Sequence, residues 1–305
     1  MSKLWVFLRN HLLFTVALLL LISILSLALF GEYLPIVDGQ LTEKNHRTAN
    51  GVLYTPPFEP SKENLFGSDH QGRDLLSLII MGAKETLLIV LLITVLRYLM
   101  AIPLAYLAHK NVLGINALIK SFNTFFSYVP TVIIVIMIAL LPPLLFTSIR
   151  PFWLIVIIAI VEVGRVATTV RDDFATLAVR DFMESGVAVG ANSMKMLRSY
   201  YLPFLYGKLA IYFISDLGKV MFLLGQLGFI GIFISQALVQ VDLGVFDIHN
   251  ESLSWPMLLA NAFMDIRGPI WIAFWPAFAM ATTIFTFNML AQGLQNVLKT
   301  KDSFI

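Results

Sequence analysis

The chain has 305 residues, of which 58% are hydrophobic and 13% charged, with a formal net charge of +2 and a mean hydropathy of +0.82. So few charged side chains cannot cover the surface of a soluble domain, and the composition therefore excludes an ordinary soluble protein. The absence of cysteine excludes disulfides and thiolate metal sites, and the lack of a basic tract argues against nucleic acid as a partner.

Six apolar segments follow one another along the chain, each about as long as a bilayer span requires. Backbone polar groups in lipid must bond within their own segment, so each segment is predicted to be a helix. The run from Leu12 to Phe30 is longer than a signal-peptide core and is predicted to be retained. The predicted fold is all-α, one membrane domain with six transmembrane helices over residues 12–30, 85–108, 117–141, 150–170, 205–236 and 270–294.

The distribution of Lys and Arg predicts how these helices are oriented. The side that holds both termini, including Lys3 and Arg9, and the polar stretch 171–202 carries twelve Lys and Arg residues, whereas the opposite side carries seven. The side richer in Lys and Arg is normally cytoplasmic. We therefore predict cytoplasmic N and C termini and a cytoplasmic loop over residues 171–203. Residues 31–74 and 236–268 are predicted to be extracytoplasmic.

Three charged residues within the predicted spans are candidates for a functional role: Arg97, Asp216 and Lys219. Arginine at the centre of a span costs about 2.5–3.5 kcal/mol on insertion scales, so Arg97 is predicted to face protein or water. Asp216 and Lys219 are three residues apart and share one helical face. Either the pair is self-neutralising while Arg97 bonds to a backbone carbonyl or snorkels, or the three residues line a translocation path or link the second and fifth helices.

Three glycines, Gly225, Gly228 and Gly231, recur at one-turn spacing in the fifth segment. That segment is longer than one span requires, and the glycines predict a tilt or a break there. Small residues at this spacing also permit close helix packing. Packing against a partner chain and a flexible point in a gate are the two alternatives.

The polar loop between the fourth and fifth segments predicts two short helices. Asp181 is a plausible N-cap with Glu184 as its capping-box partner, and Gly190 can end the helix with a positive φ. A second helix follows over residues 193–201, and Pro203 is predicted to separate it from the fifth span. The second helix would present an apolar ridge with a basic flank: Met194, Leu197 and Tyr201, with Lys195 and Arg198 beside them. The loop either docks a partner or lies on the membrane surface.

Motifs for catalysis are absent from the sequence. It contains no GxxxxGK[ST] phosphate loop, no HExxH and no GxSxG, so the chain is predicted to be neither an ATPase nor another enzyme. No metal site is predicted, because the five histidines are scattered over different segments: His11, His46, His70, His109 and His249.

The loop resembles the EAA loop of ABC importer permeases, in which Glu-Ala-Ala is followed by a glycine and then by Ile-x-Leu-Pro. The positions at the family spacing are Glu184, Gly190, Leu202 and Pro203, whereas Ser185 and Gly186 replace the two alanines and Tyr200 replaces the isoleucine. In that family the loop is the coupling helix that fits a groove on the ATPase subunit.

Three further stretches resemble the oligopeptide, dipeptide and nickel class of these permeases, and in particular its second permease subunits. Residues 66–74 are similar to "FGTDxxGRD", with Gly67, Asp69, Gly72, Arg73 and Asp74 at the family positions. Residues 254–258 resemble "SWGxML", and residues 287–296 resemble "FNLLGDGLRD". In the last stretch the family's acids and arginine are replaced by Gln292, Gln295 and Asn296, so the chain is a diverged relative.

The resemblance implies a multi-pass protein of the bacterial cell membrane that forms half of a peptide translocation pathway. It implies a homologous second permease, two cytoplasmic ATPase subunits that bind ATP and Mg²⁺, an extracytoplasmic substrate-binding protein, and no cofactor on this chain. Residues 1–30 would form the N-terminal segment and first helix, residues 31–74 an extracytoplasmic segment, and residues 75–300 a five-helix core. The implied coupling residues are Asp181, Glu184, Ser185, Gly186, Gly190, Met194, Leu197, Leu202 and Pro203.

Two other functions remain open from the sequence. The chain could serve an importer of metal chelates or another small solute. Alternatively, it could be a membrane scaffold or signalling component that kept the permease fold without transport.

Overall fold

The computed structural model describes residues 11–49, 52–145, 147, 149–232, 234–235, 237–242, 245–249 and 252–302. Lys3 and Arg9, which contribute to the predicted orientation, lie outside the described residues.

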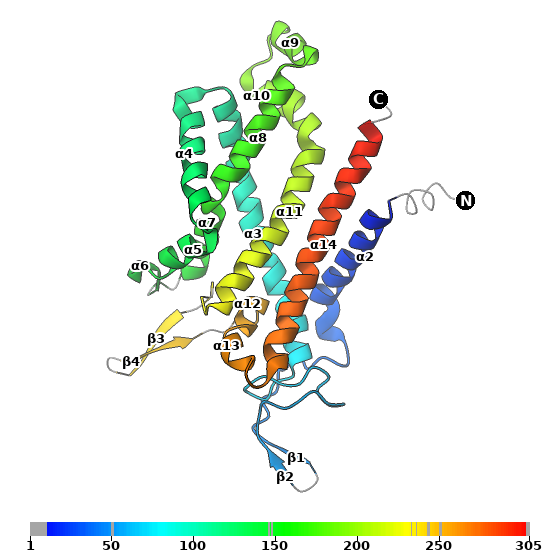
Figure 1. Cartoon of the computed structure of the whole chain (residues 1–305), viewed down its shortest axis with the longest axis vertical. Helices are drawn as coiled ribbons and strands as arrows, with labels where there is room; N and C mark the ends of the chain where they lie inside the picture. The colour runs from blue at the N-terminus through cyan, green and yellow to red at the C-terminus, as the bar shows by residue number, and fades with distance from the viewer. Residues whose placement is uncertain are drawn as a thin grey trace, which may run out of the picture.

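The described residues form an elongated bundle of helices (Figure 1). Four helical stretches are long and apolar enough to cross a membrane: α2 with η1 (Leu12–Phe30 and Gly31–Tyr33), α3 (Leu75–His109), the stretch from α10 to α11 (Ser193–Phe229), and α14 (Ile270–Asp302). Two bent helix pairs raise the number to six if each pair is one span. The all-α prediction is therefore confirmed, with four to six candidate membrane spans by length and composition.

The third predicted span is broken where the sequence analysis expects one helix. It consists of η2 (Val112–Gly114), α4 (Ile115–Tyr128) and α5 (Thr131–Ala139), with a bend of 93° between α4 and α5. Pro130 lies at the break and lacks the N–H that would continue the helix. A proline also disfavours helical backbone at the residue before it, and Val129 is extended with φ −116° and ψ 130°. The short α6 (Pro142–Leu145) follows α5.

The fourth span is bent rather than straight. It comprises α7 (Arg150–Val161) and α8 (Val163–Ala178), which meet at an angle of 42°. Glu162 lies at the bend with φ −102° and ψ 4°, outside the helical region. The bend therefore falls at a charged residue in the middle of an apolar run.

The fifth span ends earlier than predicted and is not broken at its glycines. Helix α11 (Leu202–Phe229) runs without interruption through Gly225 and Gly228. Gly228 lies against the backbone of Pro256, and a Cβ on Gly225 would lie 3.0 Å from the Met280 side chain. These glycines thus pack against elements of the same chain, whereas Gly231, with φ 84°, follows the end of the helix.

Two short antiparallel hairpins, which the sequence analysis does not anticipate, lie in the polar stretches. Strands β1 (Arg47–Ala49) and β2 (Val52–Tyr54) form one, and β3 (Ala237–Asp242) and β4 (Val245–His249) form the other. Short α12 (Trp255–Leu258) and α13 (Ala262–Asp265) follow the second hairpin and precede α14.

The two ends of the bundle carry different elements (Figure 1). Helix α9 (Asp181–Ala188) lies at one end, and the start of α2 and the end of α14 point toward that end. The two hairpins, α12 and α13 lie toward the opposite end, which we call the hairpin end. The start of α2, the end of α14 and α9 of the 171–203 loop therefore lie toward the same end of the bundle, as the charge count requires. That this side is cytoplasmic stays a prediction.

Candidate functional site

A layer of charged residues separates two buried apolar clusters in the bundle. On α3, the buried members of one cluster end at Ile93 and those of the other begin at Tyr98, with Arg97 between them. The same change from one cluster to the other falls at Glu162 between α7 and α8 and at Asp216 on α11. Three helices therefore place an ionisable residue at the same level.

Arg97 is the centre of this layer and is only 1% exposed. Its Nη1 atom lies 3.6 Å from Asp216 Oδ2 and 3.8 Å from Glu162 Oε2. Its Nη2 atom donates a hydrogen bond of 3.1 Å to the carbonyl of Ile158. The guanidinium thus connects α3 to α7, α8 and α11, and its charge is compensated inside the protein rather than in lipid.

Two further cations complete the layer, which we call the ion-pair cluster: Arg97, Glu162, Arg165, Asp216 and Lys219. Arg165 donates from Nε to Glu162 Oε2 at 2.9 Å and from Nη2 to Asp216 Oδ1 at 3.1 Å. Lys219 Nζ lies 3.3 Å from the same oxygen of Asp216. Three cations face two carboxylates, so the cluster carries one excess positive charge.

The structure brings together the three charged residues that the sequence singles out within the predicted spans, Arg97, Asp216 and Lys219. Arg97 and Asp216 link the second and fifth spans, as one of the two alternatives requires, and Asp216 also pairs with Lys219 as the other requires. Glu162 is not predicted as a partner from the sequence, and Arg165 is one of the twelve Lys and Arg residues that are assigned to the cytoplasmic side. The signal that would have revealed both is their i, i+3 spacing within the apolar run 150–170.

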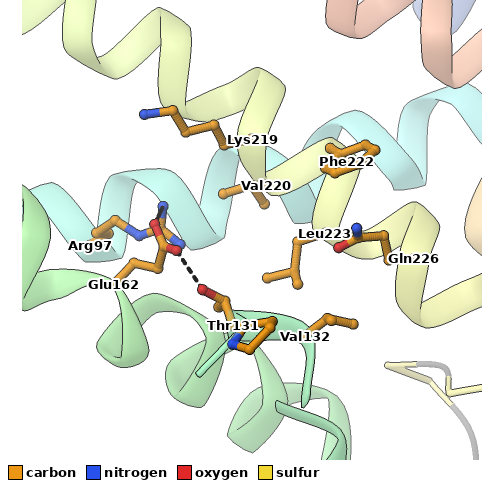
Figure 2. A pocket seen from close by; sticks show the side chains of 10 residues that line it. Arg97, Thr131, Val132, Glu162, Lys219, Val220, Phe222, Leu223 and Gln226 are labelled. Atoms are coloured by element: carbon orange, nitrogen blue, oxygen red, sulfur yellow. Dashed lines mark hydrogen bonds and ion pairs between the residues drawn. The ribbon is translucent and has the colours of Figure 1, made fainter. Parts of the chain in front are cut away.

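Cavities open on two sides of the ion-pair cluster. One of about 250 Å³ is lined by Arg97, Glu162 and Lys219 together with apolar side chains of α5 and α11. Figure 2 shows the Arg97 guanidinium beside the Glu162 carboxylate, which accepts a hydrogen bond of 2.8 Å from Thr131 Oγ1. A second cavity of about 210 Å³ is lined by Arg165, Asp216 and Lys219. The cluster therefore lies between two cavities, and Lys219 lines both of them.

Helix α9 forms the tip of the predicted coupling loop. Asp181 is its first residue rather than the residue before it, and Glu184 and Ser185 are exposed. Gly190 follows the helix with φ 80°, which confirms the prediction that it ends the helix with a positive φ. Exposed apolar side chains surround the tip, since Val189 is 79% exposed.

Gly186 and Tyr200, two departures from the family pattern, contact each other. A Cβ on Gly186 would lie 2.7 Å from Cε1 of the Tyr200 ring, closer than real side-chain contacts permit. The larger residue at position 200 is thus accommodated by the smaller residue at position 186. The two replacements preserve the docking of α9 on the following helix, η3 (Met196–Tyr201).

The second helix of the loop continues into the fifth span. Asn192 caps α10 (Ser193–Lys195) by accepting from the Lys195 N–H at 2.8 Å, and the π-helix η3 then leads directly into α11. The prediction that Pro203 separates the two helices is therefore wrong. Pro203 lies in the first turn of α11, after the π-helical turn, where the missing N–H is tolerated.

The predicted apolar ridge on this helix is only partly presented to solvent. Met194 is 69% exposed, Leu197 is half-buried, and Tyr201 is 2% exposed. The Tyr201 hydroxyl lies 3.1 Å from His109 Nε2 at the end of α3. Tyr201 therefore anchors the loop to the bundle. Leu202, the next residue, is half-buried at the start of α11.

The 66–74 motif at the hairpin end forms a turn that starts α3. Asp69 accepts hydrogen bonds from the N–H of Gln71 and of Arg73 at 2.9 Å, and its other oxygen pairs with the Arg73 guanidinium at 2.7 Å. Asp74 is the N-cap of α3, accepting from the Ser77 N–H at 2.9 Å. The two motif glycines, Gly67 and Gly72, have φ values of 81° and 75°, which the turn requires.

This turn also borders a polar cavity of about 400 Å³ at the hairpin end. His70 Nε2 lies 2.7 Å from Asp265 Oδ1, and Asp265 is 1% exposed. The contact ties the 66–74 turn to α13, which lies far along the chain. Neither residue is predicted as a site residue from the sequence.

The 254–258 motif fixes α12 against α3. The Trp255 indole donates to the carbonyl of Ile79 at 2.7 Å, and the Trp255 N–H donates to Thr86 Oγ1 at 2.8 Å. Glu85 accepts from the Ser252 hydroxyl at 2.6 Å and from the Leu253 N–H at 3.1 Å. The motif is thus a structural anchor.

The C-terminal motif lies on α14 where that helix crosses α2. A Cβ on Gly293 would lie 2.6 Å from the Phe14 Cα atom, so the glycine permits close approach of the two helices. The three positions that differ from the family pattern, Gln292, Gln295 and Asn296, are exposed. Among the residues that the structure describes, no group of three or more His, Cys, Asp or Glu side chains is arranged to hold a metal ion.

Comparison with known proteins identifies full-length relatives. The chain is 22% identical to the dipeptide transport system permease protein of Bacillus subtilis (strain 168) over 304 aligned residues, which cover 97% of this chain and 84% of the relative. It is 23% identical to the glutathione transport system permease protein of Escherichia coli O6:K15:H31, with 97% and 88% covered. The dipeptide permease protein of Alkalihalophilus pseudofirmus is 22% identical, with 96% and 88% covered. No protein-family profile matches the sequence.

The fold and the buried ion-pair cluster define a multi-pass α-helical membrane protein with a polar site inside the bundle. Over nearly its whole length the chain is a distant homologue of the permease proteins of dipeptide and glutathione transport systems from bacteria. The predicted resemblance to ABC importer permeases of the peptide class is thereby confirmed. These relatives are permease proteins rather than ATPases, in agreement with the prediction that the chain is not the enzyme of its system.

Proposed function

We propose that this chain is one of two homologous permease subunits of an ATP-driven importer of small peptides, and that it forms half of the translocation pathway. The supporting observation is that full-length homology to dipeptide and glutathione permeases coincides with a projecting helix, α9, in the position of the family's coupling helix. Residues 75–300 form the permease core in this proposal, preceded by the first helix within residues 1–30 and an extracytoplasmic segment over residues 31–74.

Helix α9 is the proposed contact with the ATPase subunits. It presents Asp181, Glu184 and Ser185 to solvent at the end of the bundle. Exposed apolar side chains flank these polar residues, since Val179 is 81% and Met194 is 69% exposed. A surface that combines exposed charged and apolar side chains is suited to docking into a groove on a partner protein.

The ion-pair cluster is the proposed constriction in the pathway. ATP binding closes the ATPase pair, the loop moves with it, and the helices alternate between openings to the two sides of the membrane. The hairpin end receives the solute from the extracytoplasmic binding protein in this scheme. The two cavities beside the cluster are then the spaces on either side of the constriction.

The docking surface can be tested by co-purification with the ATPase subunits and measurement of ATP hydrolysis in the assembled complex. Glu184→Lys reverses an exposed charge on α9, and we expect it to reduce ATPase recruitment or transport-coupled hydrolysis at least about tenfold while leaving the chain folded. Gly190→Pro is expected to have the same effect, because proline cannot adopt the φ of 80° found there.

Glu59→Lys is the matched control, since it makes the same charge reversal on an exposed residue near the hairpin end. We expect it to leave ATPase recruitment and hydrolysis unchanged. A wild-type chain that recruits no ATPase would refute the proposed function and favour a membrane scaffold. Recruitment with import of a metal chelate but not of peptides would refute only the substrate class.

A further inference from the structure

The 250 Å³ cavity beside the ion-pair cluster has an unused capacity to bind a negative charge. Arg97 and Lys219 both line it. Given the proposed function, we propose that this cavity binds a carboxylate of the transported solute, the C-terminal carboxylate of a peptide, between Arg97 and Lys219.

The first observation that supports this proposal is that Arg97 has unpaired hydrogen-bond donors. Its side chain is 1% exposed, and its Nε and Nη1 atoms have no hydrogen-bond partner. The two carboxylates near Nη1, at 3.6 and 3.8 Å, are beyond hydrogen-bond distance. Buried polar groups are normally hydrogen-bonded, so unpaired guanidinium donors beside a cavity indicate a site for an acceptor. Arginine suits this role because its planar donors match the two oxygens of a carboxylate.

The acids of the cluster do not cancel this capacity. Both oxygens of Glu162 are engaged, one by Thr131 and the other by Arg165. Asp216 is shared by Arg165 and Lys219 through Oδ1, and it lines the second cavity rather than this one. Its Oδ2 atom lies 3.6 Å from Arg97 Nη1 and has no hydrogen-bond partner, so it leaves the donors of Arg97 unpaired. With three cations against two carboxylates, a third carboxylate would neutralise the cluster. A bound cation would instead add to an existing excess of positive charge.

A helix terminus adds to the positive potential of the cavity. The nine-residue helix α5 begins at Thr131, and Pro130, Thr131 and Val132 line the cavity. The N-terminus of a helix carries a partial positive charge and favours anions. The helix begins there because the third span is broken at Pro130, and broken helices with N-termini directed at anionic groups occur at substrate sites in other transporters.

Apart from Gln226, the rest of the cavity is lined by apolar side chains, and this lining further restricts which solutes fit. In Figure 2, Val132 and Leu223 lie away from the charged groups, and Val220 and Phe222 of α11 also line the space. The volume lies slightly below the range of about 300–1,000 Å³ that is usual for complete small-molecule pockets. The cavity therefore suits one end of a molecule, a carboxylate with an adjoining apolar side chain, as at the C-terminus of a peptide.

A pair of peptides that differ only in this charge tests the proposal. The dipeptide Ala-Phe and its C-terminal amide are titrated into the full-length chain in lipid nanodiscs. We expect the free acid to bind at least about tenfold more tightly than the amide, because only the acid presents a carboxylate to Arg97 and Lys219. Lys219→Gln and Arg97→Gln are each expected to bring the affinity ratio close to one.

Lys208→Gln is the matched control for Lys219→Gln. Both lysines are on α11, their side chains are 54% and 53% exposed, and each pairs with an acid, Lys208 with Asp173 at 2.7 Å. Lys208→Gln should keep the preference for the acid. Equal affinity for the two peptides in the wild type, absence of binding, or an unchanged preference in Lys219→Gln would overturn the proposal, and the exposed position of Lys219 keeps this test valid if Arg97→Gln does not fold.

Failure of this inference is distinguishable from failure of the proposed function. The nanodisc titration contains no ATPase, so a loss of coupling cannot imitate a loss of the carboxylate site. Conversely, an importer that transports Ala-Phe and its amide at equal rates, with normal ATP hydrolysis, would exclude the carboxylate site and leave the permease function intact.

Discussion

The two ends of the bundle are held together by different kinds of contact. At the hairpin end, directional hydrogen bonds from buried or half-buried side chains fix the backbone, as Asp69, Asp74, Glu85 and Trp255 show. At the opposite end, α9 is held mainly by apolar surfaces. Phe182 stacks on Phe204 with ring centroids 4.5 Å apart, and Gly186 lies against the ring of Tyr200.

This difference indicates how the two ends respond to force. Hydrogen bonds with fixed geometry resist displacement, because small shifts leave buried donors and acceptors unpaired. Apolar contacts are non-directional and tolerate sliding. The hairpin end is therefore suited to serve as a fixed frame, whereas α9 is suited to move with a partner.

Removal of Trp255 should have the largest effect on stability. The side chain is 4% exposed and its indole bonds to Ile79, so Trp255→Ala is expected to reduce the free energy of unfolding by about 3–5 kcal/mol. Denaturant unfolding of the purified chain in detergent measures this loss. Trp255→Phe retains the ring and should lose about 1–3 kcal/mol. Equal stability of wild type and Trp255→Ala would contradict the conclusion that the hairpin end is fixed by buried side chains such as Trp255.

Removing the acidic residue at the start of a helix should change stability less than removing Trp255 does, and the change should differ between the two ends of the bundle. Asp74 bonds to the Ser77 N–H and hydroxyl, so Asp74→Ala is expected to cost about 0.5–2 kcal/mol. Asp181→Ala, at the exposed first residue of α9, should change stability by no more than about 0.5 kcal/mol. The same unfolding assay compares them, and a larger loss in Asp181→Ala would reverse the assignment of fixed and mobile ends.

The contact between Gly186 and Tyr200 should give a coupled effect. Gly186→Ala alone is expected to cost about 1–3 kcal/mol by overpacking, and part of this should return when Tyr200→Ile is added. Hydrogen exchange at the α9 amides, measured for both single variants and the double variant, reports the coupling. Additive effects would mean that the two residues do not compensate each other.

Composition and apolar runs were sufficient to predict the fold class, because a spanning helix has a length set by the bilayer. The breaks were harder to predict. The 93° bend arises because Pro130 ends a helix in the middle of an apolar run long enough to span a bilayer. Pro103, by contrast, lies inside α3 without ending it. The sequence does not distinguish these two prolines, since the outcome depends on which neighbouring helices satisfy the freed backbone groups.

The site was predictable only in part for a related reason. A charge within an apolar run signals a buried polar site, and this identified Arg97, Asp216 and Lys219. Glu162 and Arg165 also lie within an apolar run, 150–170, but Arg165 is predicted to belong to the cytoplasmic end of that run and Glu162 is given no partner. Their role depends on the 42° bend at Glu162, which turns α8 toward α11, and no local signal in the sequence reports that bend.

One helical rod connects α9, the ion-pair cluster and α12. From Ser193 to Phe229 it spans 37 residues, roughly 55 Å at 1.5 Å per residue. It contacts α9 through Tyr200, the ion-pair cluster through Asp216, and α12 through Gly228. Under the proposed function, such a rod would act as a lever with its fulcrum at the buried charges, so that a push on α9 would move the opposite end of the rod in the other direction. The π-helix Met196–Tyr201 interrupts the α-helical geometry of this rod. Its stiffness would determine how much of a displacement of α9 is transmitted to the end of the rod at Phe229.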